Sequence, residues 1–442
     1  MSDALPLPPR PHLDQYNRLA GDLQRACRSN ESSAVRDWAA AWIEALGRLQ
    51  GMPLTPEARE EVEREAARID RRWQMFKDTH ERAGTCVLAD AQFFIAREHG
   101  FASWSQFAAH VEAIMRGNSP VSNFEAAVDA IVAGDAATLK QLLDEHPELV
   151  RARSTREHRS TLLHYVSANG VEDFRQKTPK NIVAITRMLL VAGADVNAES
   201  DAYGGQSTSL GLVATSVHPE AAGVQISLLE TLLEFGADIE RPGLAGNQHL
   251  AIKGCLANGQ GTAAQFFADR GASMDLEDAA GVGRLDVVRR YFREDGTLTS
   301  DATPEQLESG FLYACGYGRT EVVRFLLDKG VDPGVRNPDG QTGLHWATYG
   351  PHVEIVDLLL ERGAPLNVKD DAFHATPMRW AVFAWANASD SRDRERACAM
   401  VAILVRAGAQ LDPESIDDKL NTRMHSDPLL QAALRGEGPP GL

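Results

Sequence analysis

The most regular feature of the chain is a short apolar stripe that recurs along it, each time followed by glycine. In residues 322–332, VVRFLLDKGVD, apolar side chains fall three and four positions apart, which predicts one face of an amphipathic helix. Similar segments occupy residues 186–195, 227–238, 264–272, 355–364 and 400–409. The glycine after each stripe, such as Gly330, suits the left-handed conformation that ends a helix. We therefore expect repeated helical units.

A second motif precedes several of these helices and opens with threonine. It reads TLLH at 161–164, TSLG at 208–211, TGLH at 342–345 and TPMR at 376–379. In this motif the chain resembles the ankyrin repeat, whose units begin T-P-L-H-x-A and recur every ~33 residues. The best single copy is residues 340–367, GQTGLHWATYGPHVEIVDLLLERGAPLN. The resemblance implies units of two antiparallel helices and a projecting hairpin finger, which bury their apolar faces against one another.

The expected fold class is all-α: an ankyrin-repeat solenoid of about eight irregular repeats over residues 119–442, preceded by an N-terminal helical domain over residues 1–118. Helical patterns in this leader cover Leu13–Arg28, Ala34–Leu49, Thr55–Phe76, Leu88–His99 and Ser103–Arg116. Its segment LADAQFFIAREHGFASWSQFAAHVE resembles one that often precedes ankyrin repeats in uncharacterised bacterial proteins. We expect the leader to cap the first repeat; a second binding module or an internal inhibitor is the alternative.

The charge of the chain restricts its partners. Its 442 residues contain 45 basic and 62 acidic side chains, so the net charge is −17, of which −15 falls in residues 119–442. No basic stripe matches a phosphate backbone or an anionic membrane, which argues against nucleic-acid and membrane binding. An acidic surface instead favours a protein or peptide partner that is basic.

The compartment is predicted from the cysteines and the apolar runs. Five cysteines stand far apart without a C-x-x-C pair, which argues against a disulfide framework and a zinc site. No apolar run reaches the ~18 residues that cross a membrane, and the first residues lack a signal core. We therefore expect a cytoplasmic protein.

Catalytic motifs are missing from the sequence. It contains no H-E-x-x-H, no G-x-x-x-x-G-K-[ST] and no G-x-S-x-G, so we predict neither an enzyme nor a cofactor nor a metal site. His164 and His345 fill the histidine of the opening motif. The resemblance implies that both hydrogen-bond between adjacent repeats.

Aromatic residues give the most specific indication of a binding surface. Tyr313, Trp346 and Trp380 are spaced 33 and 34 residues apart, which predicts a ladder along the inner, concave helices. Tyr317 and Tyr349 follow one turn later, and we assign Asp278 the same position in its own unit. These rings either recognise a partner, since aromatic side chains are enriched among interface hot spots, or pack as core between the repeats.

The finger tips are the second candidate surface. Their contact residues are Arg336 and Asp339, Asp371 and Phe373, with Asp201, Tyr203, Asn247 and Gln248 in earlier fingers. The predicted function is noncatalytic recognition of a protein or peptide through the concave face and the fingers. The alternative is an enzyme or small-molecule binder whose pocket surrounds Asp278, Tyr313, Trp346 and Trp380.

Overall fold

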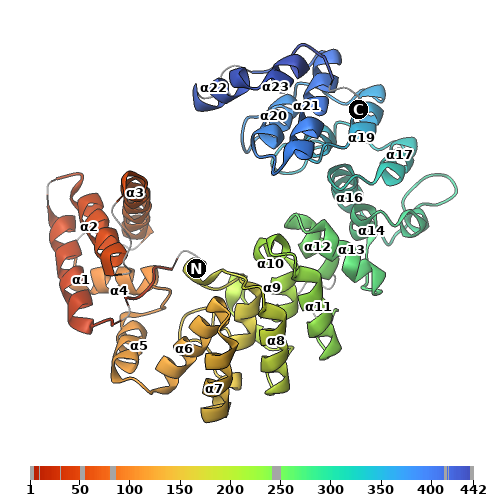
Figure 1. Ribbon diagram of the computed structural model, residues 1–442. Helices are drawn as coiled ribbons and strands as arrows, with labels where there is room; N and C mark the ends of the chain where they lie inside the picture. Colours follow the sequence, from red (N-terminus) through yellow and green to blue (C-terminus); the bar gives the residue numbers. More distant parts are fainter. Residues whose placement is uncertain are drawn as a thin grey trace. The chain divides into compact units, whose positions relative to one another are not determined.

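The computed structural model describes residues 4–8, 10–29, 31–49, 55–79, 86–240, 250–412, 416 and 418–438. Two compact units make up the chain, Met1–Leu250 and Ala251–Leu442 (Figure 1). Both consist of short helices joined by turns, and within the described ranges the one sheet has two strands. No helix among these residues is both long enough and apolar enough to span a bilayer.

The first unit contains helices and one short hairpin. Its α-helices are α1 (Leu13–Arg28), α2 (Ala34–Leu49), α3 (Pro56–Thr79), α4 (Leu88–Glu98), α5 (Trp104–Arg116), α6 (Pro120–Ala133), α7 (Ala136–Glu145), α8 (Ile182–Val191), α9 (Ser209–Ala214), α10 (Val217–Ala221) and α11 (Gln225–Glu234). Its 3₁₀ helices are η2 (Pro147–Arg151), η3 (Leu162–Ser167), η4 (Asp173–Arg175) and η5 (Ala202–Gly204), and its strands are β1 (Glu199–Ser200) and β2 (Ser207–Thr208). The two strands pair antiparallel and form a finger.

Helices α1 to α5 lie at or near the positions that the apolar pattern predicts. Ser103 caps α5 by accepting a hydrogen bond of 3.2 Å from the backbone N–H of Gln106. The buried side chains between these helices include the aromatic residues Trp73, Phe94 and Phe107. Since the first compact unit continues to Leu250, a domain boundary at residue 118 stays a prediction.

The expectation of unpaired cysteines is wrong for two of the five. Cys27 near the end of α1 and Cys86 just before α4 form a disulfide, with their Cα atoms 6.0 Å apart. The sequence hides this pair because 59 positions separate the two residues, and only the packing of α1 against α4 brings them together. Cys255, Cys315 and Cys398 are free and buried.

The second unit is a stack of two-helix repeats. Its helices are α12 (Leu250–Ala257), α13 (Gly261–Asp269), α14 (Leu276–Val282), α15 (Leu285–Val288), η7 (Arg289–Tyr291), α16 (Pro304–Gly316), α17 (Thr320–Asp328), α18 (Gly343–Tyr349), α19 (Val353–Glu361), α20 (Pro377–Ala386), α21 (Ser391–Arg406), α22 (Asp418–Ser426) and α23 (Pro428–Ala433). The first helices pack in chain order, α14 on α16, α16 on α18 and α18 on α20, while α17 packs on α19 in a second row. Neighbouring units therefore shield one another, as the pattern predicts.

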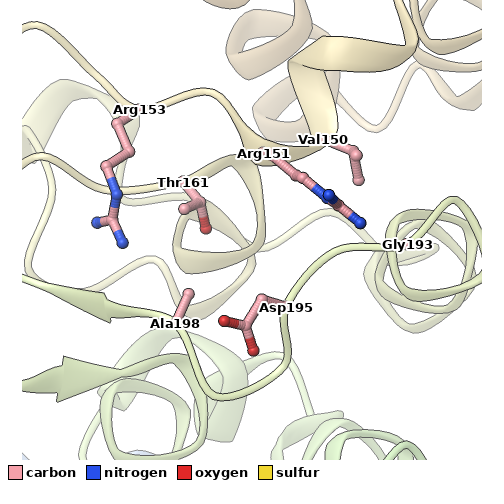
Figure 2. Close-up of a pocket in the computed structure, with 7 residues that line it drawn as sticks. All are labelled: Val150, Arg151, Arg153, Thr161, Gly193, Asp195 and Ala198. Atoms are coloured by element: carbon pink, nitrogen blue, oxygen red, sulfur yellow. The ribbon is translucent and has the colours of Figure 1, made fainter.

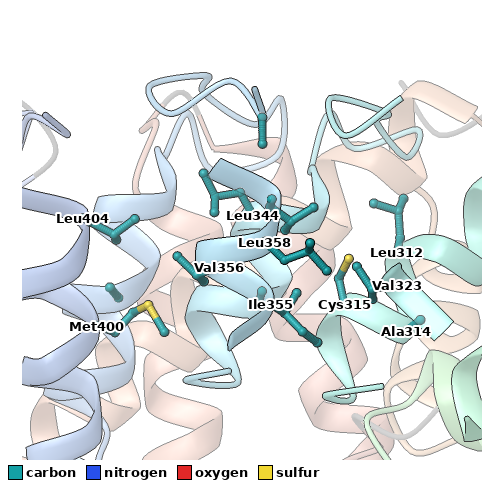
Figure 3. Close-up of a cluster of buried hydrophobic side chains, with 14 of the residues drawn as sticks. Leu312, Ala314, Cys315, Val323, Leu344, Ile355, Val356, Leu358, Met400 and Leu404 are labelled. Carbon is teal, nitrogen blue, oxygen red and sulfur yellow. The ribbon is translucent and has the colours of Figure 1, made fainter. Parts of the chain in front are cut away.

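The core of this unit runs continuously between the two rows of helices (Figure 3). Leu344 of α18, in the row of first helices that we call inner, is fully buried there. Ile355 and Val356 of α19, in the second or outer row, are fully buried as well. Gly343 begins α18 beside α16, and a Cβ atom at this position would lie 2.9 Å from the sulfur of Cys315. Close stacking of the inner helices thus depends on a residue without a side chain.

Candidate functional site

Trp346 and Trp380 occupy equivalent positions on the neighbouring inner helices α18 and α20. Thr342 and Thr376 cap the two helices, so the fifth residue of the motif, an indole in both units, falls on the same face. The ring centroids lie 5.7 Å apart at an interplanar angle of 64°. The structure thus brings together this pair of the predicted ladder.

Further aromatic rings surround Trp380. Tyr349 lies 5.9 Å from it and Phe373, on the finger, lies 6.5 Å from it. Phe383 stacks on Tyr349 at 6.3 Å. Phe383 was not among the predicted site residues, although it stands three positions after Trp380 and so one turn along the same helix face.

These rings line a cavity of about 550 Å³, within the range of ligand sites. We call it the Trp380 pocket; its lining residues are Gln341, Trp346, Tyr349, Phe373, Ala375, Arg379, Trp380 and Phe383. Three of the rings are strongly exposed: Tyr349 by 47%, Phe373 by 72% and Phe383 by 49%. The rings therefore do not all serve as core between repeats, and a partner can reach them.

A buried carboxylate fixes the finger against the inner helix. Asp370 is 1% exposed, and its Oδ2 accepts a hydrogen bond of 2.9 Å from Nε1 of Trp380. Its Oδ1 accepts a second bond of 2.5 Å from the backbone N–H of Phe373. Because both oxygens are engaged, Asp370 holds the wall and the finger of the Trp380 pocket in one arrangement.

His345 joins the two repeats beneath the Trp380 pocket. Its Nδ1 accepts from the backbone N–H of Thr342 at 3.1 Å, so the proton lies on Nε2, which donates to the carbonyl of Ala375 at 3.1 Å. His164 makes the same pair of contacts, with Thr161 and the carbonyl of Ser207. Burial lowers the pKa of both imidazoles, which keeps them neutral. Both histidines therefore link repeats, as the resemblance implies.

The predicted finger-tip residues contact one another. The backbone N–H of Asp371 donates to the carbonyl of Asp339 at 2.7 Å, which ties adjacent fingers. Arg336 donates to the carbonyls of Gly340 and Lys369 and lies 3.4 Å from the carboxylate of Asp371. The contacts of Arg336 therefore stabilise the fingers and are made within the chain. Asn247 and Gln248 lie outside the described residues, while Asp201 and Tyr203 belong to the first unit.

Tyr313 lies on α16 and Tyr317 directly follows this helix as its C-cap, and neither residue lines the Trp380 pocket. Their rings contact each other at 6.3 Å, and the hydroxyl of Tyr317 donates to the carbonyl of Leu256 at 2.5 Å. Burial raises the pKa of Tyr313 to about 12. These contacts extend the aromatic surface along the inner helices without adding to the pocket.

The position assigned to Asp278 is wrong by one residue. Asp275 caps α14, so Asp278 is the third residue of that helix and stands where His164 and His345 stand in their units. Its side chain is fully buried and accepts a hydrogen bond of 3.3 Å from the backbone N–H of Asp275. Burial and, to a smaller extent, the nearby Asp275 raise the pKa of this carboxyl to about 8.

The alternative pocket of the sequence analysis is therefore not assembled. Neither Asp278 nor Tyr313 lines the cavity that contains Trp346 and Trp380. No cluster of three or more His, Cys, Asp or Glu side chains suited to a metal occurs among the described residues.

The first unit contains an ionic cluster that the sequence analysis missed. Arg156 lies 2.8 Å from the carboxylate of Glu125 and 2.9 Å from that of Glu172, and all three side chains are buried. Arg175 adds contacts of 2.7 Å to Glu125 and to Asp129. The neighbouring guanidinium groups hold the pKa of Glu172 well below its usual range. Glu125 and Asp129 lie on α6, Arg175 ends η4, and Arg156 and Glu172 lie in loops, so no sequence periodicity marks the set.

A second cavity, of about 480 Å³, lies in the first unit between two loops (Figure 2). Its lining residues are Val150, Arg151, Arg153, Thr161, Gly193, Asp195 and Ala198. Arg153 donates hydrogen bonds to the carbonyls of Arg159 and Glu199, and these two bonds join successive fingers. With charges of both signs and few apolar walls, this cavity differs in kind from the Trp380 pocket.

Comparison with known proteins identifies the repeats. Residues 276–370 and 311–414 match the family described as Ankyrin repeats (3 copies). The serine/threonine-protein kinase TNNI3K of Mus musculus is 36% identical over 90 residues, which are 20% of this chain and 11% of the kinase. A putative ankyrin repeat-containing protein of Treponema pallidum is 29% identical over 113 residues, 24% of this chain and 38% of the relative. The 26S proteasome non-ATPase regulatory subunit 10 of Mus musculus is 47% identical over 49 residues, 11% of this chain and 21% of the subunit.

The chain thus spans well under half the length of these relatives. The matched family and the helical stacks show that the fold is an all-α ankyrin-repeat solenoid, as the sequence predicts. Ankyrin repeats generally mediate interactions between proteins.

Proposed function

We propose that this ankyrin-repeat chain is a noncatalytic scaffold that binds a protein partner, with an apolar side chain of the partner held in the Trp380 pocket. The observation that carries the proposal is the exposure of Tyr349, Phe373 and Phe383 around one cavity of about 550 Å³. Removing large apolar side chains from water lowers the free energy of the system, so a cluster of them on a surface marks a binding site.

The Trp380 pocket is organised before a partner arrives. Asp370 fixes Trp380 and the finger backbone at Phe373, and His345 fixes the repeats below them. Binding therefore orders few side chains, and more of the contact free energy appears as affinity. Tryptophan, tyrosine and arginine, all present in the lining, are the residues that most often dominate interface energetics.

The charge of the repeats favours a basic partner. A net charge of −15 over residues 119–442 attracts cations over several ångströms, which speeds encounter at low salt and is screened at high salt. In this proposal the charge sets the association rate, whereas the apolar contact in the pocket sets the lifetime of the complex.

For residues 1–118 we propose a structural role as the cap of the first repeat. Helix α5 packs on α6, and the guanidinium of Arg156 lies 5.4 Å from the ring centroid of Phe101. The backbone N–H of Glu157 also donates to the carbonyl of Gly100 at 3.0 Å. These contacts support a leader that is continuous with the repeats rather than a detachable inhibitor.

A random peptide library displayed on phage and selected on the full-length protein tests the binding proposal. The comparison protein is the double variant Phe373→Ser/Phe383→Ser, which removes two exposed rings of the pocket. A matched control, Val191→Ser/Val217→Ser, removes two exposed apolar side chains elsewhere. We expect enriched peptides to carry Trp, Phe, Leu or Met and to bind the pocket variant at least about tenfold more weakly than the control. Peptides that bind the pocket variant and the parent equally would overturn the proposal.

A further inference from the structure

The Trp380 pocket continues directly into the tips of two fingers. Gln341 and Phe373 line the pocket, and each stands two residues from a finger-tip aspartate, Asp339 and Asp371 respectively. The bond between the backbone N–H of Asp371 and the carbonyl of Asp339 closes these tips into one edge. We call Asp339 and Asp371 together the acidic rim.

The carboxylates near the pocket differ in how far they are already neutralised. Both carboxylate oxygens of Asp370 accept hydrogen bonds, from Trp380 and Phe373. The carboxylate of Asp371 lies 3.4 Å from the guanidinium of Arg336, which partly neutralises it. Lys369 pairs with Asp412. The carboxylate of Asp339 is exposed and forms no hydrogen bond or ion pair within the part of the chain that the structure describes. A full negative charge is therefore available on the rim at Asp339.

The wall of the pocket carries the opposite sign. Arg379 is one of its lining residues and is half-buried. A cation bound among the rings would share the pocket with this arginine, and like charges in a partly desolvated site repel. The aromatic walls are therefore better suited to a neutral, apolar group than to an ammonium group, despite the attraction between rings and cations. A basic group of the partner belongs at the rim and not in the pocket.

We infer that the pocket and the acidic rim form one bipartite site for an extended peptide segment, in which a large apolar side chain fills the Trp380 pocket and a lysine or arginine one or two residues away pairs with Asp339. An extended chain advances ~3.3 Å per residue, so a separation of one or two residues suits two adjoining parts of one site, as the pocket and the rim are. This inference rests on the proposed function and specifies its ligand.

Synthetic peptides with one Trp in a Gly-Ser background test the inference. The two positions on either side of Trp carry Lys, Ala or Glu, and binding to the full-length protein is measured by fluorescence anisotropy at fixed salt. We expect the Lys peptide to bind about tenfold more tightly than the Glu peptide, and both to weaken on Phe373→Ser/Phe383→Ser. Asp339→Lys should reduce or reverse the order of the peptides.

A charge-matched control distinguishes the rim from the general acidity of the chain. Glu361→Lys on α19 changes the net charge by the same amount at an exposed position outside the pocket lining. We expect it to leave the preference for the Lys peptide within about twofold of the parent. An equal loss of preference in Glu361→Lys and Asp339→Lys would overturn the inference.

Two further outcomes separate this inference from the proposed function. If the three peptides bind equally and all depend on Phe373 and Phe383, the inference fails and the proposed function stands. If no peptide, including those selected from the library, depends on these two rings, both fail.

Discussion

Nε1 of Trp380 donates a hydrogen bond of 2.9 Å to the buried carboxylate of Asp370, ten residues earlier in the chain. The contact joins an inner helix to the finger that precedes it. It also positions the central ring of the aromatic pocket, so a single buried acid couples the stability of the repeat to the shape of the proposed binding site.

Asp370→Ala should lower the free energy of unfolding by about 2–3 kcal/mol. The substitution removes the acceptor of two partly buried hydrogen bonds, from the indole N–H of Trp380 and the backbone N–H of Phe373. Thermal and urea unfolding followed by circular dichroism measure the loss. Asp371→Ala, at an exposed neighbouring position, should change stability by less than about 1 kcal/mol.

Phe311→Ala and Phe373→Ala should differ sharply although both delete a phenyl ring. Phe311 is fully buried between α14, α16 and α18, and its truncation should cost about 3–5 kcal/mol. Phe373 is 72% exposed, so its truncation should cost less than about 1 kcal/mol and act on binding instead. Equal losses in melting temperature would contradict the assignment of Phe373 to an open pocket.

Arg156→Met should destabilise the first unit by about 3–5 kcal/mol, because it removes one of the two guanidinium groups that pair with the buried carboxylates of Glu125 and Glu172. Hydrogen exchange should show reduced protection of α5 and α6 together. Arg159→Met, an exposed arginine three positions later, is the control and should stay within about 0.5 kcal/mol of the parent. Loss confined to the repeats, with α5 protected, would contradict the capping role of the leader.

The first unit should lose stability as pH falls from about 6.5 to 4. Burial lowers the pKa of His99 to about 3 and of His110 and His164 to about 4, whereas the unfolded chain binds protons near 6.5. The unfolded state thus takes up protons first and is favoured over this interval. Melting temperatures measured across the range should fall less steeply for His110→Gln than for the parent. For the exposed control His425→Gln, the fall in melting temperature should match that of the parent.

Asp278→Asn should stabilise the second unit at alkaline pH. The carboxyl has a pKa of about 8 when folded and about 3.8 when unfolded, so its stabilising effect is complete below pH 3.8 and is lost as pH rises through 8. Asparagine keeps the neutral form at every pH, so the variant should exceed the parent by about 2 kcal/mol at pH 8 and by little near pH 4. Asp301→Asn, at an exposed position, should show no such trend.

The sequence by itself determined the repeating helices and the contact between Trp346 and Trp380, whose rings meet edge to face. Apolar periodicity, capping residues and a spacing of 34 positions are local or periodic signals, and stacking of equivalent units converts such a spacing into contact. The alignment of the repeat motif with the sequence was one residue off at Asp278. The unit that begins at Asp275 has aspartate at both positions where the motif has threonine and histidine.

Only the tertiary structure decided which rings are exposed and which charges are paired. Phe373 and Phe383 become walls of one cavity with Trp346 because a finger folds back over an inner helix. Arg156 meets Glu125 and Glu172, and Cys27 meets Cys86, through loops and helix packing that bring distant positions together. Such contacts follow from the path of the whole chain, and a linear pattern carries no record of them.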